Sequence, residues 1–177
     1  MRFGSGLRSV RAILMAACWF SGCTHRHDGL AKLEAKKTEA EAILAKDPAN
    51  YHALHDLAII YGSFYMRDTM TGGASIAADK EKALAYTHDA LKKAPLTDTA
   101  DLGLNLERLG YEQEALSVYE KFLKEAQQTS APIANLASNA PAVMAREAEA
   151  EWRGLITIVQ TRADLLRKKL AEQQQSP

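Results

Sequence analysis

The feature that most constrains this chain is a helical pattern of apolar residues that proline and glycine interrupt at short intervals. Apolar side chains recur at spacings of three and four, as in amphipathic helices, and no alternating β-branched run predicts a strand. The breaks fall at Pro48, Gly72-Gly73, Pro95 and Gly110. The sequence therefore predicts an all-α fold of helices joined by short turns. The expected helices cover residues 30–46, 51–66, 75–93, 98–109, 112–126 and 141–172.

The first 22 residues differ from this pattern. Three arginines and no acidic residue precede a short apolar run, Ala12 to Phe20, which is followed by small residues. This order is typical of a secretory signal peptide, and a helix of nine residues spans only about 14 Å, half of a bilayer core. We predict that residues 1–22 are a signal peptide. Its removal leaves 19 basic and 22 acidic side chains, so the body lacks the basic character of nucleic-acid-binding proteins.

The end of this segment, Phe20-Ser21-Gly22-Cys23, resembles the lipobox of bacterial lipoproteins, with phenylalanine at the position where leucine is usual. The resemblance implies that Cys23 carries the lipid and becomes the first mature residue, with residues 23–29 as a lipidated tether. Thr24 follows, not aspartate, which in a host with two membranes implies an outer-membrane anchor facing the periplasm. The alternative is an ordinary signal peptide cut elsewhere, with Cys23 an incidental thiol.

The segment "DTADLGLNLERLGYEQEALSVYEKFLKEA" resembles a tetratricopeptide repeat. Leu102-Gly103, Gly110, Ala115 and Tyr119 stand at the family's motif positions. The resemblance implies that Gly103 faces Ala115 where two paired helices approach closely. It also implies that Gly110 ends the first helix in a left-handed conformation, which glycine adopts without strain.

The resemblance extends over residues 30–125, as one good repeat, one expanded repeat and a preceding half repeat ending at Pro48. The expanded repeat has an unusually long middle, and longer helices on both sides of Gly72-Gly73 are expected to take up part of the excess. Residues 126–140 are predicted to be a linker, and residues 141–177 a C-terminal helix and tail. The implied fold is a short tetratricopeptide-like helical-hairpin solenoid with a long C-terminal capping helix; the alternative is a generic helical bundle.

The predicted C-terminal helix carries one apolar stripe with steps of three and four. The stripe fits a cap over the open end of a solenoid. Ile158 and Leu165 lie beside it and widen the apolar face, so a partner-binding or dimerising helix remains an alternative. The stripe consists of Met144, Ala148, Trp152, Leu155, Val159, Ala163, Leu166 and Leu170.

No catalytic constellation stands out in the sequence. Gly72-Gly73 lacks the lysine and hydroxyl residue of a phosphate-binding loop, and no serine or cysteine nucleophile has a recognisable motif. His52, His55 and Asp56 share a helix, but no compact set of further ligands completes a metal site. We therefore expect a protein that is not an enzyme and that uses no cofactor and no metal.

Binding surfaces are predicted in two places. The insertion between the halves of the expanded repeat carries Phe64, Tyr65, Met66 and Met70, which suit either an extended helix-pair core or an interface. In the tetratricopeptide family the first helix of each repeat lines a concave groove, although the family's carboxylate-clamp residues are largely missing here. The resemblance places in that groove His52, His55, Asp56, Ile59, Thr97, Asp101, Leu104, Glu107 and Arg108.

These features predict a membrane-anchored protein–protein interaction scaffold. Its expected partners are proteins of the cell envelope, in secretion, pilus, outer-membrane or transport machinery, and its expected membrane contact is the lipid on Cys23. No nucleic-acid partner is expected, and the oligomeric state is left open. The rival hypothesis is an envelope enzyme, or a small-ligand or metal-binding protein, that uses the face of His52, His55 and Asp56 or the aromatic insertion.

Overall fold

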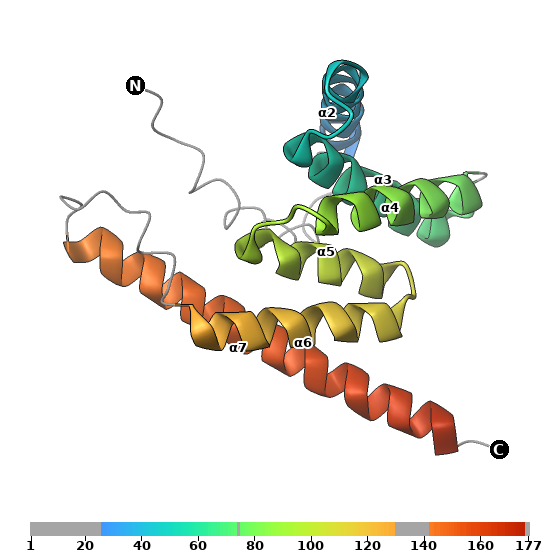
Figure 1. Cartoon of the computed structure of the whole chain (residues 1–177). Helices are drawn as coiled ribbons and strands as arrows, with labels where there is room; N and C mark the ends of the chain where they lie inside the picture. The colour runs from blue at the N-terminus through green and yellow to red at the C-terminus, as the bar shows by residue number, and fades with distance from the viewer. Residues whose placement is uncertain (1–25, 74, 130–141, 176–177) are drawn as a thin grey trace. The chain divides into compact units, whose positions relative to one another are not determined.

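The computed structural model describes residues 26–73, 75–129 and 142–175, and every secondary-structure element in these ranges is an α-helix (Figure 1). No strand occurs in this part of the chain, which confirms the predicted all-α class. The predicted signal peptide, Cys23 and most of the predicted linker lie outside the described residues. The helices are α2 (Arg26–Lys46), α3 (Tyr51–Thr71), α4 (Ile76–Leu91), α5 (Leu96–Arg108), α6 (Glu112–Gln128) and α7 (Ala142–Gln175).

Helix α3 departs most from its predicted bounds. The sequence predicts an end near Met66, but the helix continues to Thr71, whose hydroxyl donates to the carbonyl oxygen of Arg67 at 3.0 Å. Gly72 then ends the helix in the left-handed conformation, with a φ of 72°. The long middle of the predicted expanded repeat is thus largely helical, as expected. At the other ends, α2 already begins at Arg26, within the predicted tether, and α6 continues past its predicted end at residue 126 to Gln128.

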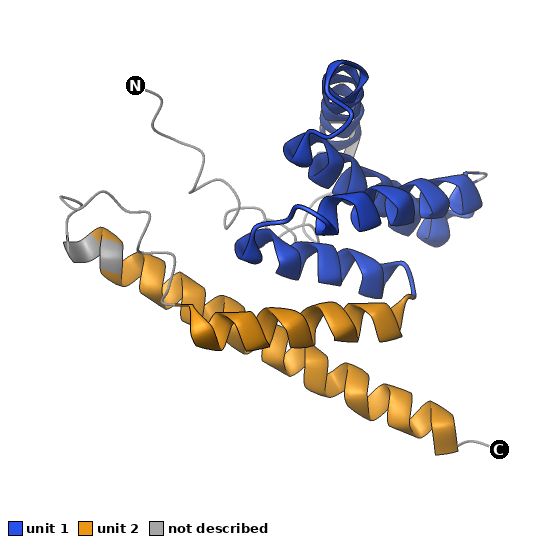
Figure 2. Ribbon diagram, in the orientation of Figure 1, with its two compact units in different colours: residues 1–110 blue, residues 111–177 orange. Residues whose placement is uncertain are grey.

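The helices divide into two compact units, residues 1–110 with α2 to α5 and residues 111–177 with α6 and α7 (Figure 2). The predicted partners Gly103 and Ala115 are both buried, one in each unit. Gly110 has a φ of 84°, which confirms the left-handed conformation predicted after α5. Its N–H donates to the carbonyl oxygen of Glu107 at 3.0 Å, so a local backbone bond closes this helix end.

In unit 1, α3 and α4 form a helical hairpin whose turn is organised by Asp68. The Asp68 carboxylate is buried and accepts from the Arg67 guanidinium at 2.6 Å. Its backbone carbonyl accepts the N–H of Gly73 at 2.9 Å. A Cβ at Gly73 would lie 2.5 Å from the Asp68 carboxyl carbon, so this close approach requires glycine.

Helices α3 and α5 run parallel in unit 1. The Tyr51 hydroxyl donates to Asp98 Oδ2 at 2.7 Å, and Asn105 Nδ2 donates to the Ala58 carbonyl oxygen at 3.0 Å. Both bonds join residues 47 positions apart, so they fix a single register between the two helices. Apolar residues from α3, α4 and α5 pack in the same region. This core cluster consists of Leu54, Ala58, Ala90 and Leu102.

Asn105 joins all three of these helices. Besides its bond to Ala58 on α3, its side-chain amide donates to the Thr87 hydroxyl on α4 at 2.8 Å. The residue is 2% exposed, and a Cβ at Gly62 would lie 2.0 Å from its side-chain oxygen. A buried amide is tolerated only when it is hydrogen-bonded, so these contacts tie the position of α5 to both helices of the hairpin.

In unit 2, α6 packs along α7 through an apolar seam. The rings of Phe122 on α6 and Trp152 on α7 have centroids 5.6 Å apart. The middle of the predicted α7 stripe is buried, whereas Met144 at its start is exposed and the flanking Ala148 and Leu170 are half-buried. The sequence pattern therefore located the packed face of α7 correctly. Its buried members are Trp152, Leu155, Val159, Ala163 and Leu166.

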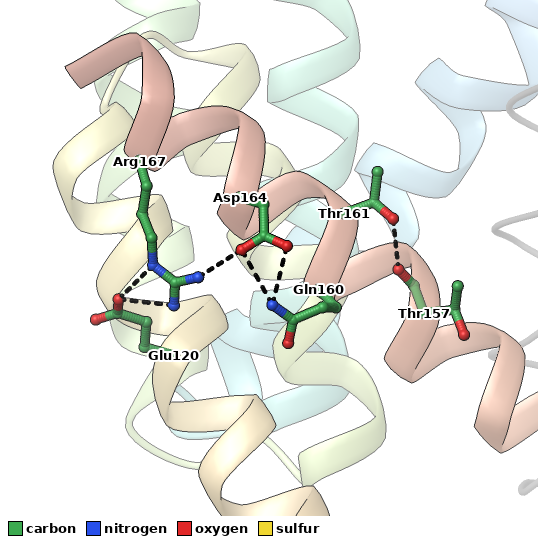
Figure 3. Close-up of polar contacts among 6 residues, drawn as sticks. All are labelled: Glu120, Thr157, Gln160, Thr161, Asp164 and Arg167. Atoms are coloured by element: carbon green, nitrogen blue, oxygen red, sulfur yellow. Dashed lines mark hydrogen bonds and ion pairs between the residues drawn. The ribbon is translucent and has the colours of Figure 1, made fainter. Parts of the chain in front are cut away.

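A chain of exposed polar contacts lies along the edge of this seam (Figure 3). Arg167 on α7 donates through Nε and one Nη to Glu120 on α6 at 3.0–3.1 Å, and through the other Nη to Asp164 at 2.7 Å. Gln160 donates to both oxygens of Asp164 at 3.1 Å. These acidic partners raise the pKa of Arg167, first through the hydrogen bond to Glu120.

Candidate functional site

The predicted groove residues lie on α3 and α5, the two helices that run parallel in unit 1. His52, Asp56 and Arg108 are exposed. The other predicted groove residues are half-buried: His55, Ile59, Thr97, Asp101, Leu104 and Glu107.

The centre of this region is a bond that the sequence did not predict. Tyr51, the first residue of α3, donates its hydroxyl to Asp98, which is only 6% exposed in the first turn of α5. Asp98 Oδ1 also accepts from the Thr97 hydroxyl at 2.9 Å. A carboxylate in the first turn is favoured by the helix dipole, and the two hydroxyls satisfy it after burial. Burial and the bond to Asp98 raise the pKa of Tyr51, which remains protonated and donating.

A spacing signal for this site was present in the sequence. Tyr51 and His55 are four residues apart on α3, and Asp98 and Asp101 are three apart on α5, so each pair shares a helix face. What the sequence lacked was the pairing of these faces. The Tyr51–Asp98 bond supplies this pairing of faces. Since the two helices run parallel, the next turn of each helix then brings His55 towards Asp101.

His55 is the titratable group at the centre of this cluster. Its ring lies 5.8 Å from that of Tyr51, and its Nδ1 is 3.9 Å from Asp56 Oδ1. Nε2 is buried and has no hydrogen-bond partner within the described part of the chain. Burial acts to lower the pKa of His55, but Asp56 and the negative charges of Asp98 and Asp101 outweigh it and raise that pKa above 6.5.

Asp101 is the second titratable group of this region and lies on α5. Burial raises its pKa to about 6, and the negative charge of Asp98 adds to this effect. The positive charges of His55 and Arg108 act to lower that pKa but do not restore the usual value. The pKa of Asp101 therefore lies closer to neutrality than that of an exposed aspartate.

The residues of the predicted insertion surface are spread between core and solvent. Phe64 is buried in the α3–α4 hairpin, where the Arg67 guanidinium lies 5.1 Å from its ring centroid. Tyr65 and Met66 are half-buried, and the Lys80 ammonium lies 5.7 Å from the Tyr65 ring. Met70 is 72% exposed near the end of α3. The structure thus gives Phe64 a packing role and leaves Met70 at the surface.

The described side chains that could bind a metal do not gather into a site. Among the described residues, no group of three or more His, Cys, Asp or Glu side chains is arranged to hold a metal ion. The described helices likewise include none that is long and apolar enough to cross a membrane. Cys23, the predicted lipid-bearing residue, lies outside the described residues.

Comparison with known proteins adds no relative to this description. Neither a protein-family model, nor a curated protein, nor a solved structure matches the chain.

Proposed function

We propose that this protein is a lipid-anchored interaction scaffold of the bacterial cell envelope, built from tetratricopeptide-like helical hairpins. The single observation that carries the proposal is the parallel packing of α3 and α5. Two bonds with the same 47-residue offset hold these helices together, and α4 lies between them along the chain. Parallel first helices of successive hairpins are the arrangement that the resemblance to tetratricopeptide repeats implies.

The surface of α3 and α5 is the proposed docking groove for a protein partner. Its exposed members His52, Asp56 and Arg108 are polar, while Ile59 and Leu104 are half-buried and add apolar contact. Such a mixture is typical of non-obligate protein interfaces. The partner is proposed to belong to an envelope assembly, such as secretion, pilus, outer-membrane or transport machinery.

The anchor is tested by replacing the proposed lipid-bearing cysteine. Cys23→Ser is expected to abolish labelling by a fatty-acid analogue and to release the protein from membranes, because the acylated thiol is missing. Cys18→Ser is the matched control, since Cys18 precedes the proposed cleavage site and leaves with the signal peptide. Equal labelling of wild type and Cys23→Ser would exclude the lipoprotein assignment.

The groove is tested by crosslinking in intact cells followed by isolation of the tagged protein. Asp56→Lys reverses an exposed charge in the groove, and Glu81→Lys reverses an exposed charge on α4 outside it. Partner crosslinks are expected to be lost with Asp56→Lys and kept with Glu81→Lys. Unchanged crosslinks in both variants would place the interface elsewhere. An activity or small-ligand affinity lost on His52→Ala would instead favour the rival class of enzyme or ligand-binding protein.

A further inference from the structure

A second face of α7 is exposed beside the stripe that packs on α6. Ile158 and Leu165 are seven residues apart, so they lie on the same side of the helix, and they are 47% and 62% exposed. Residues at steps of three and four before, between and after them share this side and are exposed as well. We call this set the outer face of α7. It consists of Glu151, Gly154, Ile158, Thr161, Leu165 and Lys168.

Gly154 is the member of the outer face that the packing of the described helices does not require. Glycine in the interior of a helix is less favourable than alanine. A Cβ at Gly154 would meet no atom within 4 Å, whereas a Cβ at Gly62 would lie 2.0 Å from Asn105. A gap in the middle of an exposed face instead suits the close approach of a large side chain from a second helix.

The two ends of the outer face carry opposite charges. Glu151 lies one turn before Gly154, and Lys168 lies one turn after Leu165, where its ammonium is also 3.9 Å from Glu172 of the same helix. A second α7 that ran parallel and in register would place each of these charges against its like. An antiparallel α7 would place Glu151 of one copy against Lys168 of the other at both ends of the contact. The charge pattern therefore favours an antiparallel second copy.

We propose that the outer face of α7 is the dimerisation surface of this protein, and that it binds the outer face of a second copy in antiparallel orientation. In each facing pair, the two residues are equally far from the midpoint between residues 159 and 160. A single two-fold axis at this point therefore forms all the pairs at once. The pairs are Gly154 with Leu165, Ile158 with Thr161, and Glu151 with Lys168.

The register of this dimer is set by the same residues. A shift by one heptad in one direction would place Lys168 against Ile158 of the second copy, and a shift in the other would place Glu147 against Leu165. Either shift brings a charge into an apolar contact, which is costly because the charge loses water without gaining a partner. In the proposed register, the apolar residues meet only small or apolar-sided neighbours, and the charges meet at the ends.

The polar residue at the centre of the contact is already satisfied within its own helix. The Thr161 hydroxyl donates to the Thr157 carbonyl oxygen at 2.9 Å (Figure 3), so Thr161 can enter an apolar contact without an unpaired donor. Because so few residues take part, the dimer is expected to be weak and to form between micromolar and millimolar concentration. It is independent of the proposed docking groove, which lies on α3 and α5.

The first measurement is sedimentation of the full chain over this concentration range, under reducing conditions that prevent disulfides between copies. The wild type is expected to shift from monomer to dimer, and Leu165→Glu should stay monomeric because it places a charge in the apolar contact. Ala171→Glu adds the same charge on another exposed side of α7 and should dimerise like the wild type. A wild type that stays monomeric throughout would overturn the dimer and assign the outer face to a different protein. Equal dimerisation of Leu165→Glu would overturn it as well.

The second measurement tests the antiparallel register by exchanging charges. Glu151→Lys and Lys168→Glu each place like charges opposite one another and should weaken dimerisation about tenfold or more in dilute buffer. The double variant restores opposite charges and should recover the association of the wild type. All four chains share residues 1–22, and every change is at an exposed position, so differences between them arise on the surface of α7.

The double variant distinguishes the proposed register from the other arrangements. In a parallel, in-register dimer, each charge faces its own copy, so neither the single changes nor the double change would alter the repulsion. Equal association of all four chains would therefore overturn the antiparallel dimer. A double variant that associates as weakly as the single variants would overturn the pairing of Glu151 with Lys168, and with it the proposed surface. Circular dichroism of each chain checks that its helix content equals that of the wild type.

Discussion

The two units of this protein hold their helices together by opposite arrangements of polar and apolar groups. In unit 1, buried polar contacts lie inside the helix contacts, with Asn105 and Asp98 almost fully enclosed. In unit 2, the seam of Phe122 and Trp152 is apolar, and the polar chain through Arg167 lies at the exposed edge. Buried hydrogen bonds are directional and expensive to leave unmade, whereas apolar contacts are not directional. In unit 1, buried hydrogen bonds therefore fix the register of the helices. In unit 2, most of the stability comes from the apolar area that the seam buries.

The largest expected effect comes from breaking the apolar seam of unit 2. Trp152→Ala should destabilise this unit by about 3–5 kcal/mol, because it removes a buried aromatic ring and leaves a cavity. Hydrogen exchange should show lost protection in α6 and α7 and little change in α3 to α5. Ile158→Ala is the matched control on the same helix, since Ile158 is 47% exposed. Similar losses in both variants would show that the buried stripe is not the source of stability.

A smaller but more informative effect is expected from the polar core of unit 1. Asn105→Leu keeps much of the side-chain size but cannot donate, so it should cost about 1–3 kcal/mol by leaving buried acceptors unsatisfied. Thr87→Val removes only one of the two bonds and should cost less. Because both residues share a bond, the double variant should lose less than the sum of the single losses in thermal unfolding. Additive losses would mean that Asn105 acts by packing alone.

The smallest expected effect is at the exposed edge of unit 2. Glu120→Gln removes the charge that Arg167 contacts from α6, and surface ion pairs contribute little because water and salt screen them. The thermal midpoint should fall by no more than about one degree in dilute buffer. In about 1 M salt the difference should disappear. A large fall that persists in salt would show that the edge, and not the seam, sets the α6–α7 register.

The elements of this fold are largely readable from the sequence because helix formation is a local property. The apolar spacing located the helices, and Gly110 predicted a left-handed turn. The packed face of α7 followed from its stripe, although Met144 is exposed. The end of α3 was missed by five residues because a polar stretch without proline or glycine suits either a loop or a solvated helix end.

In the candidate site, local features were predicted from the sequence and contacts between helices were not. His55 and Asp101 could be placed on helix faces from their positions, and the Tyr51–Asp98 bond shows that these two faces meet. Tyr51, Asp98 and Asn105 were missed as partners, because their bonds join different helices over 18 or 47 positions of the chain. The sequence by itself determined the helices, their turns and their apolar faces, since these depend on neighbours within a few residues. Only the tertiary structure decided which faces meet and in what register. Burial and long-range hydrogen bonds depend on chain segments that lie far apart in the sequence.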